Sequence, residues 1–169
     1  MRVPPASAIV SPMRLYHSSR LRKGRNSEER RIYLITPICD GRKRVFSDSI
    51  AAQILVAPIR AQALEDRCEN CCYVVMPDHL HWLLQLAEGA SLSDVVGRAK
   101  GRSSLQINRS LGGIGRIWQA GFHDHAVRVE EDLENLAYYT ILNPVRAGLV
   151  SRAEDYPHWW SRWHPRVRV

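Results

Sequence analysis

"CCYVVMPDHLHWLLQL", residues 71–86, is the stretch that decides the fold of this chain. Two apolar segments flank Pro77 and Asp78, a pair of residues that favours a tight turn. Strand-like segments joined by so short a connection are typical of a β-hairpin. We therefore expect two antiparallel strands here, within a mainly antiparallel sheet.

The second of these segments contains two histidines. Side chains alternate between the faces of a strand, so His79 and His81 share one face. The other face is apolar and predicts core: Leu80, Trp82, Leu84 and Leu86. Two neighbouring imidazoles can hold a metal ion from two sides, whereas a pair buried as ordinary core would leave ring nitrogens without hydrogen bonds. The pair predicts a metal site and leaves the third ligand and the reaction open, with a purely structural pair as the alternative.

Other elements follow from local patterns on either side of this hairpin. A β-branched and aromatic run predicts a first strand at 31–38. Helical spacing predicts helices at 47–67 and 91–110, the first capped by Ser47 and kinked or split by Pro58.

The last part of the chain continues this alternation. We expect a glycine-rich loop at 111–121, a short strand at 123–129 and a helix at 130–144 that Pro144 ends. The loop lacks the spacing of a phosphate-binding loop, so no nucleotide cofactor is expected. This order of elements predicts an α+β fold, a ferredoxin-like sandwich whose helices pack on one face of the sheet.

Composition and charge suggest the class of partner. The 169 residues are 45% apolar, enough for one domain, and carry 24 Lys+Arg against 17 Asp+Glu, a net charge of +7. Residues 1–31 hold eight Arg or Lys and two Glu, so most of the excess lies in a basic arm. We expect this arm at 1–30, a folded domain at 31–150 and an aromatic, basic tail at 151–169. The charge favours a polyanionic partner over an acidic one, with a tail that only aids solubility as the alternative.

The lack of a recognisable targeting signal and the cysteine pattern both predict an intracellular protein. No apolar run reaches the length of a membrane span, and no signal peptide is recognisable, so we expect no membrane and a cytoplasmic protein. The four cysteines include one C-x-x-C, Cys68 and Cys71, without the second pair that a structural zinc site needs. Free thiols are therefore expected.

The helix expected at 130–144 offers candidate partners for the histidines. At 100° per residue, one stripe faces the core: Leu133, Leu136, Ala137, Thr140 and Ile141. Tyr139 and Asn143 lie one turn apart on one flank, and Tyr138 lies on the other flank. Only Tyr139 thus has a polar neighbour able to bind metal, although two half-exposed residues without a role would show the same spacing.

Four segments in order resemble the REP-associated tyrosine transposases, a branch of the single-tyrosine HUH transposase and nuclease family. They are "LRKGRNSEERRIYLIT" (21–36), "YVVMPDHLHWLLQL" (73–86), "RIWQAGFHDHAVR" (116–128) and "YYTILNPVRAGLV" (138–150), within a resemblance that spans roughly residues 20 to 162. The resemblance implies a catalytic domain at 31–150 whose central strand carries His79 and His81 as ligands for Mg²⁺ or Mn²⁺. It also implies Tyr139 as nucleophile and Asn143 as third metal ligand.

The activity implied by this resemblance is cleavage and rejoining of single-stranded DNA next to repeat hairpins. It would proceed through a 5′-phosphotyrosine, which keeps the ester energy, so no nucleotide cofactor is needed. The partner would be single-stranded or hairpin DNA, the protein a monomer or homodimer, and its location cytoplasmic and nucleoid-associated. A host-adopted protein that binds hairpin DNA and cleaves little is the alternative, and a hydrolase of small phosphoesters fits the basic arm poorly.

Candidate DNA contacts are drawn from the basic and aromatic residues. Phosphate contacts are expected from Arg14, Arg22, Lys23, Arg25, Arg42, Lys43 and Arg44, and from Arg98, Lys100 and Arg102 on the basic side of the 91–110 helix. Trp118, Trp159, Trp160 and Trp163 are candidates for base stacking, with completion of the core as the alternative. "HDH", His123, Asp124 and His125, is not expected to be the primary metal site; a hydrogen-bonding role or a place near the site is left open.

Overall fold

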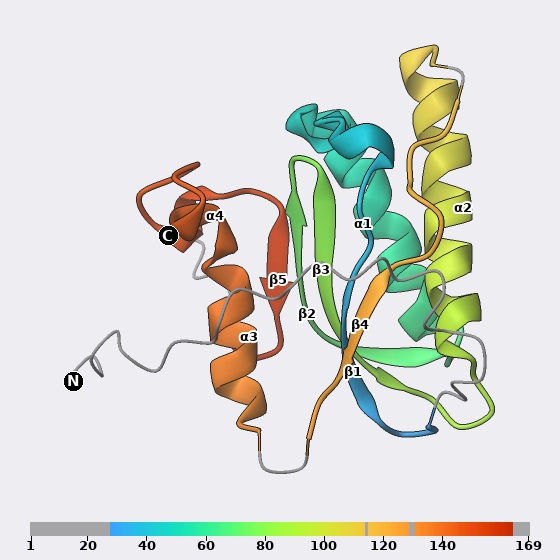
Figure 1. Cartoon of the computed structure of the whole chain (residues 1–169), viewed down its shortest axis with the longest axis vertical. Helices are drawn as coiled ribbons and strands as arrows, with labels where there is room; N and C mark the ends of the chain where they lie inside the picture. Colours follow the sequence, from blue (N-terminus) through green and yellow to red (C-terminus); the bar gives the residue numbers. More distant parts are fainter. Residues whose placement is uncertain (1–27, 114, 129–130, 164–169) are drawn as a thin grey trace.

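An antiparallel sheet forms the centre of the computed structural model, which describes residues 28–113, 115–128 and 131–163. Its five strands lie in the order β4-β1-β3-β2-β5, and every neighbouring pair is antiparallel (Figure 1). The strands are β1 (Ile32–Thr36), β2 (Cys68–Met76), β3 (His79–Leu86), β4 (His123–Ala126) and β5 (Trp159–Ser161). The predicted α+β class with a mainly antiparallel sheet is confirmed.

The predicted hairpin is confirmed as β2 and β3. Their register runs from the Met76–His79 pair at the turn to the Cys68–Leu86 pair, with one irregularity between Asn70 and Cys72. Pro77 and Asp78 form the turn, and their carbonyls accept hydrogen bonds from the backbone N–H groups of Phe46 and Cys39, at 2.9 and 2.8 Å. The segment after β1 therefore holds the end of the hairpin in place.

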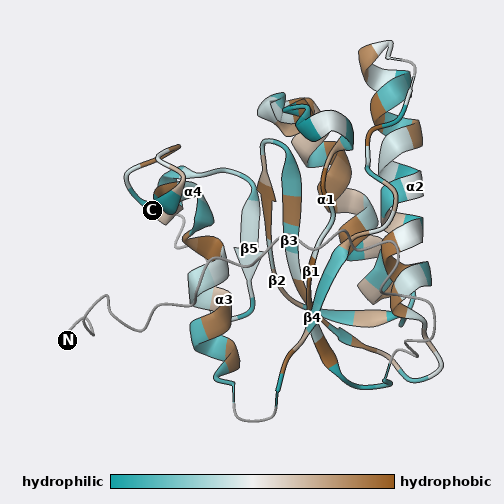
Figure 2. Cartoon of the chain, in the orientation of Figure 1, coloured by the Kyte–Doolittle hydropathy of each residue, from teal (hydrophilic) through white to brown (hydrophobic). Residues whose placement is uncertain are grey.

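Two long helices, α1 (Ser49–Leu64) and α2 (Leu92–Leu111), cover one face of the sheet. The core under them contains the residues of β3 that the alternation assigned to it: Leu80, Trp82, Leu84 and Leu86. Much of the apolar sequence lies in the central strands and α1, drawn in brown (Figure 2). This face holds the larger of the two apolar clusters in the described part of the chain.

A third helix, α3 (Leu133–Ile141), lies on the opposite face and continues into the short α4 (Asn143–Arg146). Its Ala137 and Ile141 pack in a second core with Val74, Leu83 and Trp159. The helices therefore cover both faces of the sheet, not one as expected. The physical reason lies in β2, where every residue from Cys71 to Met76 is buried, so that both faces of this strand need cover.

Helix α1 differs from expectation at its start and in its middle. The side chain of Asp48, not Ser47, caps it by accepting from the N–H groups of Ile50 and Ala51, at 2.8 and 3.1 Å. Pro58 does not split the helix, which continues to Leu64. Buried Leu55 and Ile59 on either side of the proline hold both halves against the same core.

The end of the described chain joins the sheet. After the short helix η3 (Ala153–Asp155), β5 pairs with β2 through Cys72–Ser161 and Val74–Trp159. Residues 159–161 were expected in a C-terminal tail but belong to the folded sheet. The basic arm up to residue 27 lies outside the described residues. None of the helices in the described part combines the length and apolar character needed to cross a membrane.

Candidate active site

The two histidines of β3 lie side by side on the face of the sheet that carries α3. Their Nε2 atoms are 3.1 Å apart, and the rings are nearly perpendicular, at 89°. Leu83, the next residue on this face, packs in the α3 core. The alternation of the strand thus brings the imidazoles together as predicted.

Each histidine is fixed through its other ring nitrogen. The Nδ1 of His79 lies 2.6 Å from the carboxylate Oδ1 of Asp78, and the Nδ1 of His81 lies 3.2 Å from the hydroxyl Oγ1 of Thr36. An Nδ1–H donated to a carboxylate leaves the Nε2 lone pair free to bind a metal, and metal-binding histidines are usually oriented in this way. Asp78 and Thr36 therefore prepare both Nε2 atoms to face one point.

Burial keeps His81 uncharged. Its removal from solvent, followed by the nearby His79 and the positive charge of Arg146, lowers the pKa of His81 to about 3. The imidazole is therefore neutral at neutral pH, which is the form that binds metal ions.

The spacing of the two nitrogens is compatible with a partial coordination shell of Mg²⁺ or Mn²⁺, the ions that the resemblance implies. Two ligands at right angles on an ion with bonds of about 2.1 Å would be roughly 3 Å apart, close to the 3.1 Å between the Nε2 atoms. No group of three or more His, Cys, Asp or Glu able to hold a metal occurs among the described residues. Further ligands would thus be oxygens of an amide, water or substrate, which both ions accept readily.

Helix α3 presents two exposed tyrosines. Ala137, Thr140 and Ile141 of the predicted stripe are buried, which leaves Tyr139 54% and Tyr138 47% exposed. The helix ends at Ile141, earlier than predicted, because Pro144 lies in the first turn of α4 and starts that helix.

Asn143, one turn beyond Tyr139, is held by hydrogen bonds within the α3–α4 segment. Its Nδ2 donates to the carbonyl of Thr140 at 2.8 Å, and its Oδ1 accepts from the guanidinium of Arg146 at 2.7 Å. The same guanidinium lies over the ring of Tyr139, 5.6 Å from its centroid. The structure thus brings Tyr139 and Asn143 together as predicted, with Arg146 between them.

A basic loop borders the histidine pair. This loop contains the short helices η1 (Asp40–Arg42) and η2 (Val45–Ser47). It carries three consecutive exposed cations, Arg42, Lys43 and Arg44. Arg42 pairs with Asp78 at 3.3 Å, which ties the loop to the turn before His79. Burial alone would raise the pKa of Asp78, but the hydrogen bonds and charges of His79 and Arg42 lower it below its usual value, so Asp78 is anionic at neutral pH.

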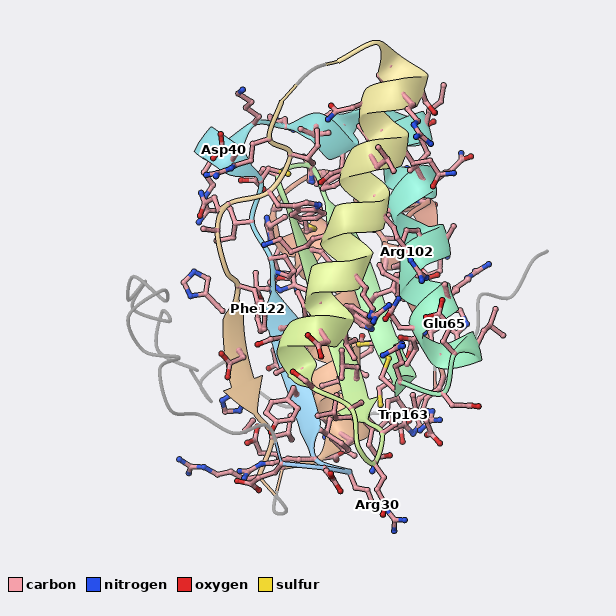
Figure 3. The ribbon with its side chains drawn as sticks, turned by 90° about the vertical axis from the view of Figure 1, so that its right-hand side faces the viewer. Arg30, Asp40, Glu65, Arg102, Phe122 and Trp163 are labelled. Atoms are coloured by element: carbon pink, nitrogen blue, oxygen red, sulfur yellow. The ribbon has the colours of Figure 1, made fainter. Side chains whose placement is uncertain are left out.

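The cations of α2 lie elsewhere. This helix covers the face of the sheet opposite the histidines, so Arg98, Lys100 and Arg102 are not brought to the site. The ammonium of Lys100 donates to the carbonyls of Gln119 and Gly121, both at 2.7 Å, and Arg102 pairs with Glu65 at the end of α1 (Figure 3). The four predicted contacts of the arm, Arg14, Arg22, Lys23 and Arg25, lie outside the described residues.

Two of the four tryptophans that were candidates for base stacking complete the core. Trp118 and Trp159 are buried, and their indole N–H groups donate to Ser103 Oγ and the carbonyl of Ala153, at 3.1 and 2.7 Å. Trp160 is 37% exposed and stacks on Tyr73, and Trp163 is partly buried beside the guanidinium of Arg162. Trp160 is thus the most exposed of the four, but its stacking on Tyr73 of the larger core places it on the face of the sheet opposite the histidines.

The "HDH" segment forms β4 at the edge of the sheet. His123 is paired in register with Thr36, so both lie on the face that carries His81, whereas Asp124 lies on the other face. His125 contacts Glu131 at 3.1 Å. Hydrogen bonding thus accounts for His125, and His123 lies two strands from the histidine pair.

Sequence reasoning missed three residues of this site. Asp78 had a visible signal, because an acidic residue directly precedes His79 in the turn. Thr36 and Arg146 had none, since their approach to the site depends on the pairing of β1 with β3 and on the position of α4.

Residues 27–140 match the family described as "Transposase IS200 like". The chain is 32% identical over 95 residues to the REP-associated tyrosine transposase of Escherichia coli (strain K12), covering 56% of this chain and 54% of that protein. A curated relative from Haemophilus influenzae is 31% identical over 111 residues, 60% of this chain and 62% of its own, so the match spans just over half the length of each relative.

One solved structure shares both fold and sequence with this chain. It is described as a REP-associated tyrosine transposase bound to a REP hairpin, with a TM-score of 0.65 and 25% sequence identity. The match covers 80% of this chain and 79% of that one, so the similarity includes most of the sheet and its helices.

Proposed function

The chain belongs to the family of IS200-like transposases, and from this we propose that it cleaves and rejoins single-stranded DNA next to hairpins through a covalent bond to Tyr139. One observation carries the proposal above all others. The Nε2 atoms of His79 and His81 face each other at 3.1 Å while both Nδ1 atoms are held by oriented partners. Such a pair suits a metal ion that binds a phosphate.

Tyr139 is proposed as the nucleophile because it is exposed and lies beside Asn143 on α3–α4. A new bond joins its hydroxyl oxygen to phosphorus, and the bond from phosphorus to the 3′-oxygen breaks. The tyrosine loses its proton, and the 3′-oxygen leaves with the bonding electrons and takes up a proton. The products are a 5′-phosphotyrosine and a free 3′-OH, and attack by another 3′-OH reverses the step and rejoins DNA.

Metal assistance is part of the proposal, because a tyrosine hydroxyl with a pKa of about 10 is a weak nucleophile at neutral pH. Mg²⁺ or Mn²⁺ held by His79, His81 and Asn143 would polarise the scissile phosphate and offset its charge. The chain itself keeps His81 neutral by burial and orients His79 through Asp78. Asn143 can serve as a ligand when its Oδ1 exchanges Arg146 for the ion.

The proposed partner is hairpin or single-stranded DNA, bound by a monomer or homodimer in the cytoplasm near the nucleoid. The solved REP-associated relative is bound to a REP hairpin. In this chain the exposed cations at 42–44 lie next to the histidine pair and can contact phosphates there.

A covalent-adduct assay tests this proposal. Purified protein is incubated with end-labelled hairpin oligonucleotides from repeats flanking its own gene, with Mn²⁺ or EDTA, and separated under denaturing conditions. We expect an adduct that needs the metal, is lost in Tyr139→Phe and is kept in Tyr138→Phe. The two tyrosines are neighbours with similar exposure, so the second variant is a matched control.

Other outcomes of this assay contradict the proposal in different ways. An adduct that persists in Tyr139→Phe would exclude Tyr139 as nucleophile. Salt-sensitive binding without an adduct on any repeat would favour a host-adopted protein that binds hairpin DNA and does not cleave it.

A further inference from the structure

Arg146, the last residue of α4, lies between the groups proposed to act on DNA. Its guanidinium is over the ring of Tyr139 at 5.6 Å and donates to Asn143 Oδ1 at 2.7 Å. One cation thus contacts both Tyr139 and Asn143, the proposed nucleophile and the proposed third metal ligand.

The side chain has the capacity to bind a further ligand. A guanidinium carries five N–H donors, and Asn143 accepts from one of its nitrogens. Arg146 is exposed to solvent, so a DNA strand reaching Tyr139 also reaches this group. Arginine binds phosphate oxygens in pairs because its planar fork matches their geometry.

The charge of Arg146 remains available to bind a phosphate. Arg42, beside the turn before His79, is paired with the carboxylate of Asp78. Arg146 makes its hydrogen bond to a neutral amide, so its charge is not neutralised by that contact.

We propose that Arg146 is a further catalytic residue, whose guanidinium binds the non-bridging oxygens of the scissile phosphate and holds it beside Tyr139. This inference rests on the proposed cleavage function. Negative charge on these oxygens repels the incoming tyrosine oxygen, and a fixed cation offsets that repulsion as the new bond to phosphorus forms. Contact with the Tyr139 ring keeps the nucleophile and the phosphate-binding group in one arrangement.

A change in phosphate charge separates this role from a structural one. Adduct formation is measured in single turnover on a hairpin oligonucleotide with either a normal phosphodiester or a neutral methylphosphonate at the cleavage position. Wild type is compared with Arg146→Gln and Arg146→Lys. The control is Arg152→Gln, an exposed arginine whose pair with Glu154 lies outside the site. Thermal unfolding shows whether each variant folds.

On the phosphodiester, Arg146→Gln should slow adduct formation on the order of 10²-fold, as loss of a charge-stabilising donor typically does. Arg146→Lys should be slowed less, because it keeps the charge without the planar fork. On the methylphosphonate, the difference between wild type and Arg146→Gln should be much smaller, since this group lacks the negative charge that the phosphodiester carries before attack and that Arg146 is proposed to offset. Arg152→Gln should match wild type on both.

Two results would overturn this inference, and they are distinguishable. An equal defect of Arg146→Gln on both oligonucleotides would assign the residue a structural role and leave Tyr139 chemistry intact. A wild-type protein without an adduct on either oligonucleotide would overturn the proposed function and the role of Arg146 together.

Discussion

At the scale of one residue, Asp78 contacts both His79 and the basic loop at 42–44. Its carboxylate accepts from His79 Nδ1 at 2.6 Å and pairs with Arg42 at 3.3 Å. A charged acceptor at Nδ1 raises the basicity of the opposite ring nitrogen and fixes the ring. One carboxylate therefore orients a proposed metal ligand and positions a basic loop.

Replacement of Asp78 by Asn should weaken the proposed metal site without removing a ligand. We expect Asp78→Asn to lower Mn²⁺ affinity by about 10–100-fold, the usual effect of losing an outer partner. Isothermal titration with MnCl₂ measures this without an activity assay. Asp155→Asn, at an exposed aspartate of η3, is the control. Unchanged affinity in Asp78→Asn would show that this carboxylate does not support a metal ligand.

The four cysteines should be inert in the folded protein. All are buried and free, and burial raises the pKa of Cys39, Cys68 and Cys72 to about 12 and raises that of Cys71. Thiolate is the reactive form, so a raised pKa leaves almost none of it at pH 8. A thiol reagent such as DTNB should label none of them natively and all four in guanidinium chloride. Rapid stoichiometric labelling of folded protein would contradict this burial.

At the scale of elements, α3 depends on its cap. Asp132 accepts from the N–H groups of Glu134 and Asn135 at 3.0 and 3.1 Å, in the helix that carries Tyr139. Asp132→Ala should lower the free energy of unfolding by about 1 kcal/mol, whereas Asp132→Asn, another good cap, should lose much less. Urea denaturation followed by circular dichroism measures both. Equal losses in the two variants would mean that the cap hydrogen bonds are not the source of the stability.

How far the sequence predicts these elements depends on how local their signals are. The hairpin and the helices were predictable because turn residues and apolar periods act within a few residues. The prediction of helices on one face missed α3 on the other, although the unbroken apolar run at 71–76 already indicated a strand buried on both sides. Leu83, which shares the face of His79 and His81, is buried under α3.

The candidate site was likewise predictable only where its signals are local. Strand alternation alone placed His79 and His81 together, and helix spacing placed Tyr139 one turn from Asn143. The approach of Arg146 to Tyr139 could not be foreseen, because it depends on a further helix, α4, that begins at Asn143, whereas Pro144 was expected to end the helix that carries Tyr139. The basic residues of α2 were predicted to contact DNA from their charge alone. Charge carries no information about which face of the sheet a helix covers.

At the scale of the whole molecule, the exposed cations of the described chain include one group beside the turn before His79 and another on α2. The loop with Arg42, Lys43 and Arg44 borders the histidines, and α2 covers the other side. If DNA binds on the histidine face, the loop and not α2 should contribute to counterion release from the bound strand. Salt dependence of binding therefore reports which face is used.

We expect the affinity for a hairpin oligonucleotide with a single-stranded flank to fall steeply between low and physiological salt. Replacing Arg42, Lys43 and Arg44 by Gln should reduce the slope of log affinity against log salt by about 2, at roughly 0.7 per phosphate contact on a single strand. The matched control changes the same charge on α2, at Arg98, Arg102 and Arg109, and spares Lys100 because its ammonium holds two backbone carbonyls. Fluorescence anisotropy over a salt series gives both slopes. A reduced slope in the α2 variant with an unchanged slope in the loop variant would place the DNA on the opposite face, away from the proposed nucleophile.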